Sequence, residues 1–138
     1  MILKKCFFLL FSFSLVLISN SVFAAKLAGV VERVQGNAQV VFAKGKEAIE
    51  VKDEIFKGDK ISTDADAELV IRMTDGAVLA VRPKTNLTIT DYRFNNKNSS
   101  NDNMLIRLLK GGLRVVTGAI GKKNPQKVKF KGSVLVKC

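Results

Sequence analysis

The apolar residues of this chain come in short runs rich in valine and isoleucine, and Gly, Asn, Asp and Lys residues separate one run from the next. No stretch beyond the N-terminal segment sustains the period of an amphipathic helix. This pattern is typical of short β-strands joined by tight turns. It predicts an all-β fold of about eight to ten strands, either an antiparallel β-sandwich or a short coiled β-sheet of many short strands.

Turn residues divide the first part of the chain into strands. Three strands are predicted in AGVVERV (28–34), AQVVFA (38–43) and AIEV (48–51). A corner follows, in which Gly58 and Asp59 make a turn. Ile55, Phe56 and Ile61 are the expected core residues on either side of this corner.

Residues 68–82 predict a hairpin with a defined register. A three-residue loop at 74–76, with Gly76 in the left-handed conformation, keeps apolar residues opposite one another on one face. It pairs Leu69 with Val81, Ile71 with Leu79 and Met73 with Ala77, and it places Glu68 opposite Arg82. A two-residue turn would set Leu69 against Arg82 and mix charge into the apolar face, so we reject it. Asp75 is then a turn residue whose carboxylate accepts nearby amide protons.

The second half of the chain predicts further strands and one loop. A strand that contains Leu87 and Ile89 should end near residues 92–94, and residues 95–103, which include no apolar side chain, predict a mobile loop. Two strands on either side of Gly111 and Gly112 are favoured over a helical turn. The final run VKFK, in which lysines alternate with apolar residues, predicts an edge strand.

Residues 1–24 have the features of a secretory signal peptide. Two lysines precede an apolar run from Cys6 to Ile18, and small residues occupy the positions of a cleavage site before Ala25. We expect cleavage after Ala24, with an uncleaved anchor as the alternative. The remainder, 25–138, would be one domain in the periplasm or outside the cell, without a transmembrane span.

The chain is strongly basic, with 23 Lys and Arg against 12 Asp and Glu and a net charge of +11. Removal of the two lysines of the signal would leave +9. On an exported protein this charge favours an anionic cell-surface polymer or membrane over nucleic acid. Simple solubility is favoured over either partner, because the charges are spread through the chain. The basic run 110–131 has Phe130 as its only ring, which also argues against nucleic acid. Cys138 has no partner for an intramolecular disulfide after cleavage, so it either pairs with another molecule or has no function.

The sequence contains no recognisable catalytic or cofactor site. It has no histidine, the usual general base of serine and cysteine hydrolases and the commonest transition-metal ligand. A calcium loop that began at Asp64 would need Gly at its sixth position and Glu at its twelfth, where the chain has Leu69 and Asp75. The glycines at 111–112 and at 118–121 lack the ending of a phosphate loop. We therefore predict a protein that is not an enzyme and binds no metal or cofactor.

Structural roles are expected for the prominent glycines and acids. The turn residues are Gly58, Asp59, Asp75, Gly76, Gly111 and Gly112. A glycosidase would need two carboxylates that converge across a cleft, and the spacing of the acids at 59–68 does not predict convergence. Asp64, Asp66 and Glu68 are expected to be solvated at the start of a strand, where they form a candidate surface for a partner.

Three segments in order resemble the periplasmic FecR domain family: GVVERVQGNAQVV, IFKGDKISTDADAELVIRMTDGAVLAVRPKTNLTI and LLKGGLRVVTG. The resemblance extends from Gly29 to Phe130. The matching residues are Gly58, Asp59, Ile61, Thr63, Ala67, Asp75, Gly76, Pro83 and Gly112. It implies an all-β periplasmic domain that senses or relays through binding, in a family whose members act in cell-surface signalling with an outer-membrane receptor and a sigma factor. The family has no catalytic residues to carry over.

Two departures from the family pattern affect the expected function. Signalling regulators of the family carry a cytoplasmic, sigma-factor-binding segment before a membrane span, whereas five residues precede the apolar run here. The family pattern after the VKF strand continues with Thr-Pro and an Arg-Gly-Thr strand, where this chain has KGSVLVKC. We expect a FecR-like binding or signalling module that lacks its final strand, which would leave an unpaired edge that invites association. The alternative is a basic envelope-associated protein that adheres to anionic surface polymer.

Overall fold

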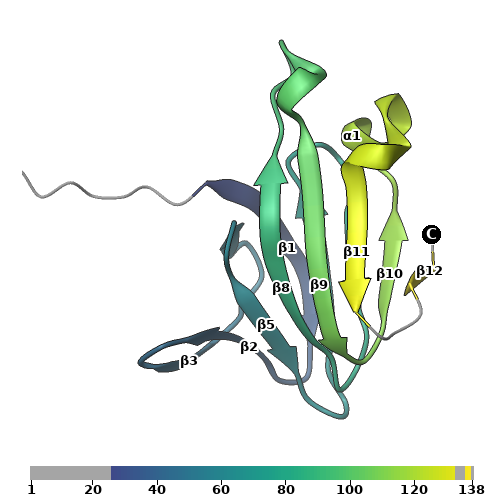
Figure 1. Cartoon of the computed structure of the whole chain (residues 1–138). Helices are drawn as coiled ribbons and strands as arrows, with labels where there is room; N and C mark the ends of the chain where they lie inside the picture. Colours follow the sequence, from purple (N-terminus) through teal and green to yellow (C-terminus); the bar gives the residue numbers. More distant parts are fainter. Residues whose placement is uncertain (1–25, 133–135, 138) are drawn as a thin grey trace, which may run out of the picture.

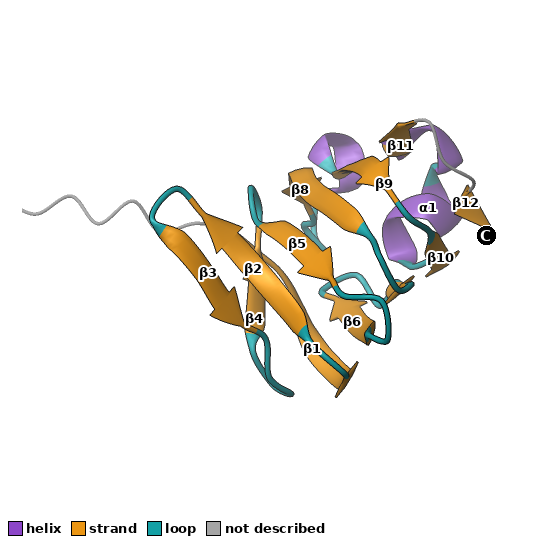
Figure 2. Cartoon of the chain, turned by 90° about the horizontal axis from the view of Figure 1, so that it is seen from below, coloured by secondary structure: helices purple, strands orange, loops and turns teal. Residues whose placement is uncertain are grey.

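Two β-sheets pack face to face and form the two layers visible in Figure 2. The computed structural model describes residues 26–132 and 136–137 (Figure 1). Each sheet has six strands within this part of the chain. The predicted signal peptide, its cleavage point and Cys138 lie outside the described residues.

The strands are distributed so that neighbours in sequence often lie in different sheets. Sheet A contains, in spatial order, β12 (Val136–Lys137), β10 (Leu113–Val116), β7 (Val78–Val81), β6 (Glu68–Met73), β1 (Leu27–Gln35) and β4 (Glu54–Phe56). Sheet B contains β11 (Val128–Gly132), β9 (Asn103–Lys110), β8 (Asn86–Arg93), β5 (Lys60–Thr63), β2 (Ala38–Phe42) and β3 (Gly45–Ala48). The described helical segments are α1 (Ala119–Lys123) and two 3-10 turns, Ser99–Asn101 and Pro125–Lys127.

One core fills the space between the sheets. Successive side chains of a strand point to opposite faces, so alternate residues of each strand are buried. The largest fully buried side chains are Tyr92, Ile55, Ile61, Leu69, Ile71, Met73, Leu79, Leu87, Ile89, Met104, Ile106 and Leu108. Ile120 of α1 packs onto the same core. The predicted all-β sandwich is confirmed, and Phe56, an expected core residue, is only half-buried.

The hairpin of β6 and β7 has the predicted register. The observed pairs are Leu69 with Val81, Val70 with Ala80, Ile71 with Leu79 and Arg72 with Val78. Gly76 has a φ of +88°, and the amide of Met73 donates to the carbonyl of Ala77 at 2.8 Å. The Arg82 guanidinium lies 3.4 Å from the Glu68 carboxylate. The β6–β7 register that keeps charged side chains off the buried face, as predicted from the sequence, is therefore confirmed.

The strand count and one strand position were predicted wrongly. Twelve strands occur in the described residues rather than eight to ten, because pieces as short as β4 and β12 pair with a neighbour. The third strand was expected at 48–51 but lies at 45–48. Ile49 is only 5% exposed and packs into the core, and the chain turns at residues 51–52, so the apolar run belongs to the turn region rather than to a strand.

The helix α1 was not predicted, because five residues are too few to show a helical period. It follows Gly118 and contains Gly121. Most strand pairs are antiparallel, as predicted, but β9 with β11 and β10 with β12 are parallel. These pairs arise because the chain crosses to the other sheet between their two strands.

The predicted strands around the double glycine are confirmed as β9 and β10, which belong to different sheets. Gly111 has a φ of +93°, and a Cβ there would overlap Thr85. The hydroxyl of buried Thr85 accepts the amide of Gly112 at 3.0 Å. Gly111 therefore lets the chain pass close to Thr85 as it crosses between the layers, and the amide of Gly112 bonds to the same residue.

The predicted edge strand and loop can also be located. The lysine-rich run is confirmed as β11, at one edge of sheet B. The loop predicted at 95–103 runs over residues 94–102 and contains a 3-10 turn. Within it, the buried Asp102 carboxylate accepts the Asn95 amide at 2.7 Å. The mobility of this loop stays a prediction.

Asp75 and Tyr92 form a buried polar contact between the two sheets. The Tyr92 hydroxyl accepts the Asp75 amide at 3.0 Å and donates to Asp75 Oδ1 at 3.1 Å. Asp75 Oδ2 accepts the amide of Ile120 at 3.2 Å, which connects α1 to the same contact. Burial raises the pKa of Tyr92 well above its usual range, so the hydroxyl keeps its proton and remains a donor. The hairpin of sheet A, strand β8 of sheet B and α1 thus meet at one carboxylate.

Removal of the Tyr92 hydroxyl should destabilise the fold. Tyr92→Phe leaves the buried Asp75 amide without its acceptor, so we expect the free energy of unfolding to fall by about 1–3 kcal/mol in urea denaturation. Thr74→Val is the control, because the exposed Thr74 hydroxyl donates to the same oxygen at 2.9 Å from the solvent side. We expect this variant to change stability by about 0.5 kcal/mol or less. Equal stability of Tyr92→Phe and the wild type would contradict the role of the contact.

Alanine substitutions at two glycines should separate backbone strain from steric overlap. Gly58 has a φ of +92° and nothing within 4 Å of an added Cβ, so Gly58→Ala should lower the free energy of unfolding by about 1 kcal/mol. Gly111 has nearly the same φ but lies against Thr85, so Gly111→Ala should cost more than about 3 kcal/mol. Thermal or chemical denaturation of both variants measures the difference. Similar losses would show that the close approach to Thr85 is easily relieved.

Candidate functional site

The three acids predicted to form a partner surface lie close to the turn between β1 and β2. Asp64 and Asp66 are exposed, and Glu68 is half-buried. Asp64 Oδ2 accepts the side-chain amide of Asn37 at 2.7 Å, and the backbone around Asp66 contacts Gly36. Glu68 pairs with Arg82. Part of this acidic surface is therefore already engaged within the molecule.

The predicted turn residues 57–59 form the corner between β4 and β5. Gly58 has a positive φ, and its amide donates to the carbonyl of Ile89 at 2.7 Å. Asp59 Oδ2 accepts the amide of Phe56 at 2.8 Å, which closes the turn. Burial raises the pKa of the Asp59 carboxyl, and the bond from Phe56 offsets part of this effect.

A groove lies beside this corner, between the edge strands of the two sheets. The edges are β3 in sheet B and β4 in sheet A, and both end their sheets within the described residues. The groove has a volume of about 530 Å³. Its lining residues are Val40, Phe42, Glu47, Ala48, Lys52, Asp53, Glu54, Ile55, Phe56 and Asp59.

The groove combines an apolar floor with an acidic rim. Ile55 is buried and Val40 and Phe56 are half-buried, so they form the floor. Four of the lining residues are acids and Lys52 is the one base among them. No ion pair within the described part of the chain involves these four acids. An apolar segment with basic side chains would match both properties.

Among the described residues, β3 pairs with β2 alone, so its other edge is available for pairing along this groove. The amide of Ile49 donates to the carbonyl of Ala38 at 2.9 Å, so the alternating pattern of antiparallel bonds turns Glu47 toward β2. The N–H and C=O groups of Lys46 and Ala48 then face away from β2. An extended segment from another molecule can pair with such an edge.

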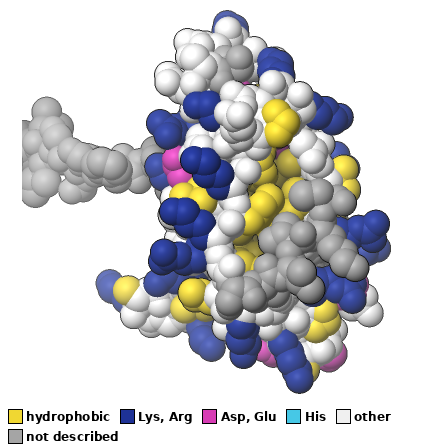
Figure 3. All heavy atoms as spheres, turned by 45° about the vertical axis from the view of Figure 1, so that its right-hand side comes forward, with side chains coloured by type: hydrophobic (Ala, Val, Ile, Leu, Met, Phe, Trp, Pro, Cys, Tyr) yellow, Lys and Arg dark blue, Asp and Glu magenta, His cyan; other side chains and the backbone are white. Residues whose placement is uncertain are grey.

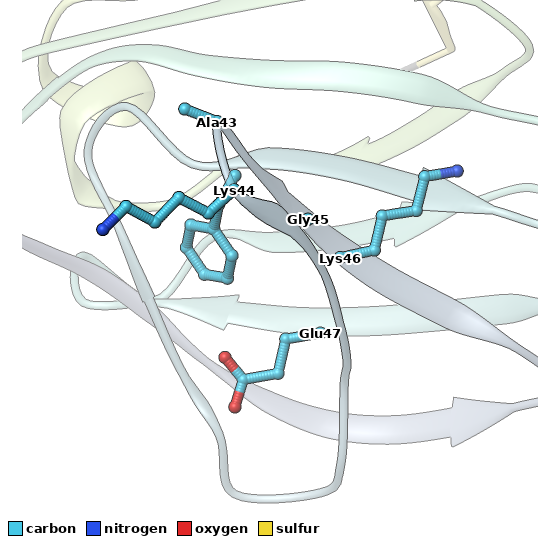
Figure 4. Close-up of a pocket in the computed structure, with 6 residues that line it drawn as sticks. Ala43, Lys44, Gly45, Lys46 and Glu47 are labelled. Carbon is cyan, nitrogen blue, oxygen red and sulfur yellow. The ribbon is translucent and has the colours of Figure 1, made fainter.

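The tip of the β2–β3 hairpin forms a second, open hollow of about 560 Å³ next to the groove. Phe42, which is 49% exposed, and Glu47 line both hollows. Figure 4 shows that the side chains of Lys44 and Lys46 extend in opposite directions and that Glu47 extends away from both. The hairpin tip thus adds apolar surface beside the groove.

Charges of opposite sign collect at opposite edges of sheet B. At the β3 edge, the groove lining holds four acids and one lysine. Residues 103–132, which include β11, hold eight Lys and Arg residues and no acid. Figure 3 turns the side with β10 and β11 forward and shows Lys and Arg around this face with few acidic side chains. The side with β10 and β11 is therefore basic, and the groove at the other edge of sheet B has an acidic lining.

The groove was missed in the sequence because its acids come from three separate places. Glu47 lies in β3, Asp53 and Glu54 lie just before and at the start of β4, and Asp59 lies in the corner. Each acid alone has the pattern of a solvated turn. The one signal in the sequence was the enrichment of acids in residues 45–68 of a basic chain. That these acids share one groove becomes clear only in the structure, where β3 and β4 lie at the edges of different sheets.

Two other properties concern metal ions and membranes. Within residues 26–132 and 136–137, no three side chains of the types His, Cys, Asp or Glu lie together as metal ligands would. In the same part of the chain, no helix has the length and apolar character required to cross a membrane.

The Asp59 carboxyl should leave a signature in the pH dependence of stability. Its pKa is raised in the folded state from the usual 3.8, so the folded protein holds this proton more tightly than the unfolded chain. Stability linked to Asp59 is therefore present at low pH and is lost as the pH rises through the folded pKa. Asp59→Asn keeps an acceptor for Phe56 without the charge.

We expect the free energy of unfolding of Asp59→Asn, relative to the wild type, to increase as the pH rises from about 3 to about 6. Chemical denaturation at each pH measures this difference. Asp59→Ala is the control, because it loses the bond to Phe56 and should be less stable than Asp59→Asn throughout. A pH-independent difference between Asp59→Asn and the wild type would be inconsistent with a raised pKa.

Comparisons with known proteins place the fold in a family. A search of curated proteins gave no match. A solved structure described as a cell surface anchoring domain is similar, with a TM-score of 0.41 and 19% identity over 44% of this chain and 82% of that chain. The model of the family described as FecR protein matches residues 59–136, which is more than half of the 138 residues. The resemblance inferred from the sequence is confirmed, and the chain belongs to the FecR protein family.

Proposed function

We propose that this protein is a non-enzymatic protein-binding module of the cell envelope, and that the groove between β3 and β4 receives an extended, basic segment of its partner. The observation that carries the proposal is the coincidence of an apolar floor, an acidic rim and an open strand edge in one place. FecR-like domains mediate protein interactions, which agrees with this function. The module would sense or relay a signal by occupancy of the groove.

Strand addition explains how the three features of the groove act together. A bound strand would pair its backbone with the outward groups of Lys46 and Ala48. Its side chains would alternate between the two faces of the sheet, so one set would lie on the groove side. Long basic side chains in that set could lay their apolar stems against Val40 and Phe56 and reach the acidic rim with their charged ends. Backbone pairing gives affinity in such complexes, and the side-chain pattern gives specificity.

The proposal also covers the location and extent of the module. We place it in the periplasm or outside the cell, because residues 1–24 have the features of a cleavable secretory signal. The domain would comprise residues 25–138. Signalling would then depend on contact with an envelope protein.

A second candidate function is adhesion to anionic surface polymer or membrane. Its support is the run of eight bases without an acid in residues 103–132, of which Lys129 and Lys131 are exposed on an edge strand. Such binding depends on counterion release and screening, so it weakens steeply as salt increases. Binding in the groove, which buries apolar surface, should depend on salt much less.

A labelled peptide tests the groove. The probe is an extended peptide of about seven residues in which lysine and valine alternate, and fluorescence anisotropy measures its binding. We expect binding that Glu47→Gln with Glu54→Gln weakens roughly tenfold, because two exposed charge pairs are lost. A peptide of the same pattern with glutamate in place of lysine should not bind.

The matched control neutralises the other acidic surface, with Asp64→Asn, Asp66→Asn and Glu68→Gln in one variant. Full binding by this variant supports the groove, whereas loss of binding here and not in the groove variant would assign the contact to the surface predicted from sequence. No binding to the wild type, or equal binding of the lysine and glutamate peptides, would overturn the proposal. Vesicles with anionic phospholipid, assayed over a range of salt, report separately on the second candidate.

A further inference from the structure

We propose that the groove of one molecule binds strand β11 of a second copy of this chain, so that copies join head to tail through sheet B. This inference rests on the proposed function of the groove and identifies its occupant. The two surfaces lie at opposite ends of the same sheet, since β3 is one edge strand of sheet B and β11 is the other. Pairing of β3 with a β11 from another copy would continue the sheet across both molecules.

Strand β11 presents the long basic side chains that the acidic rim of the groove requires. Its sequence is VKFKG, in which Val128 and Phe130 pack against the core of their own molecule. Lys129 and Lys131 are exposed on the opposite face. The strand pairs with β9 on one side only, within the described residues, so its other edge is open. It is therefore a preformed extended segment that presents lysines at alternate positions.

Charge selects how the two copies are oriented. Glu47 is paired directly with Val40, which packs against the core, so Glu47 lies on the groove side of β3. Lys46, the preceding residue, lies on the other side. If the lysine face of β11 lies over the groove, Lys129 and Lys131 meet the acidic rim; in the reverse orientation they lie beside Lys46. The favoured orientation places sheet A of the two copies on opposite sides of the joined sheet B.

The same charges disfavour the symmetric alternatives. Two β11 edges would bring lysines together, and two grooves would bring their acidic rims together, so each edge repels its own kind. The contact is therefore heterologous: each copy uses its groove toward one neighbour and its β11 toward the other. Such contacts continue beyond two copies, either into a closed ring or into an open filament.

Complementary charge reversal tests the arrangement. The acceptor variant carries Glu47→Lys and Glu54→Lys, and the donor variant carries Lys129→Glu and Lys131→Glu. Each is made in the full chain from an exporting bacterial host and studied by sedimentation velocity in reducing buffer, with circular dichroism to show that the fold is kept. We expect the wild type to form species larger than a dimer as its concentration rises to about 0.5 mM. Each variant alone should remain a monomer.

An equimolar mixture gives the decisive result. The acceptor variant retains its β11 and the donor variant retains its groove, so the mixture should form a dimer of one copy each and nothing larger. A chain with all four substitutions should associate again, because the charges are exchanged rather than lost. The variant with Asp64→Asn, Asp66→Asn and Glu68→Gln should associate like the wild type.

Several outcomes would overturn the inference. They are a wild type that stays monomeric or stops at a dimer, variants that associate like the wild type, or a mixture that remains monomeric. Titration of the lysine–valine peptide into the same wild-type sample separates this failure from failure of the proposed function. Peptide binding without self-association rejects only the second copy as occupant, whereas absence of both rejects the groove as a binding site.

Discussion

The buried contact between Asp75 and Tyr92 fixes how the two sheets lie against each other at one end of the sandwich. Apolar packing between sheets is not directional, so it does not by itself select one alignment. A buried carboxylate does, because its oxygens must find donors and their positions are fixed by geometry. Here the donors come from β8 of the opposite sheet and from α1. This end of the molecule is therefore closed by hydrogen bonds as well as by apolar side chains.

At the groove, the two sheets end in different edge strands, β3 in sheet B and β4 in sheet A. Within the described residues, β3 pairs only with β2, and β4 is a three-residue strand that pairs only with β1. Val40, Ile55 and Phe56 line the groove between these two strands, and Val40 and Phe56 are only half-buried. The same short strands and charged side chains that protect an edge from aggregation also define a groove with a specific charge.

The sequence predicted correctly those features that depend on residues close together in the chain. The β6–β7 register followed from the position of charge around Gly76, and β11 followed from the alternation of lysines with Val128 and Phe130. Features that depend on distant residues were not accessible. The apolar Ile49 indicated a strand but packs beyond the end of β3, and Tyr92 gave no sign that its hydroxyl would meet Asp75 of the other sheet. The groove was missed for the same reason, since it exists only where two sheets end side by side.

Separation of charge along sheet B has a consequence for signalling. If β11 of a second copy and a basic strand of an envelope partner both fit the groove, they compete for it, and occupancy by one excludes the other. The balance then depends on the local concentration of the chain, because self-association follows mass action. At high protein concentration, most grooves would be occupied by neighbouring copies. A partner would then have to displace a neighbouring copy before it binds. Competition of this kind allows a single binding site without catalytic groups to respond to both partner and protein concentration.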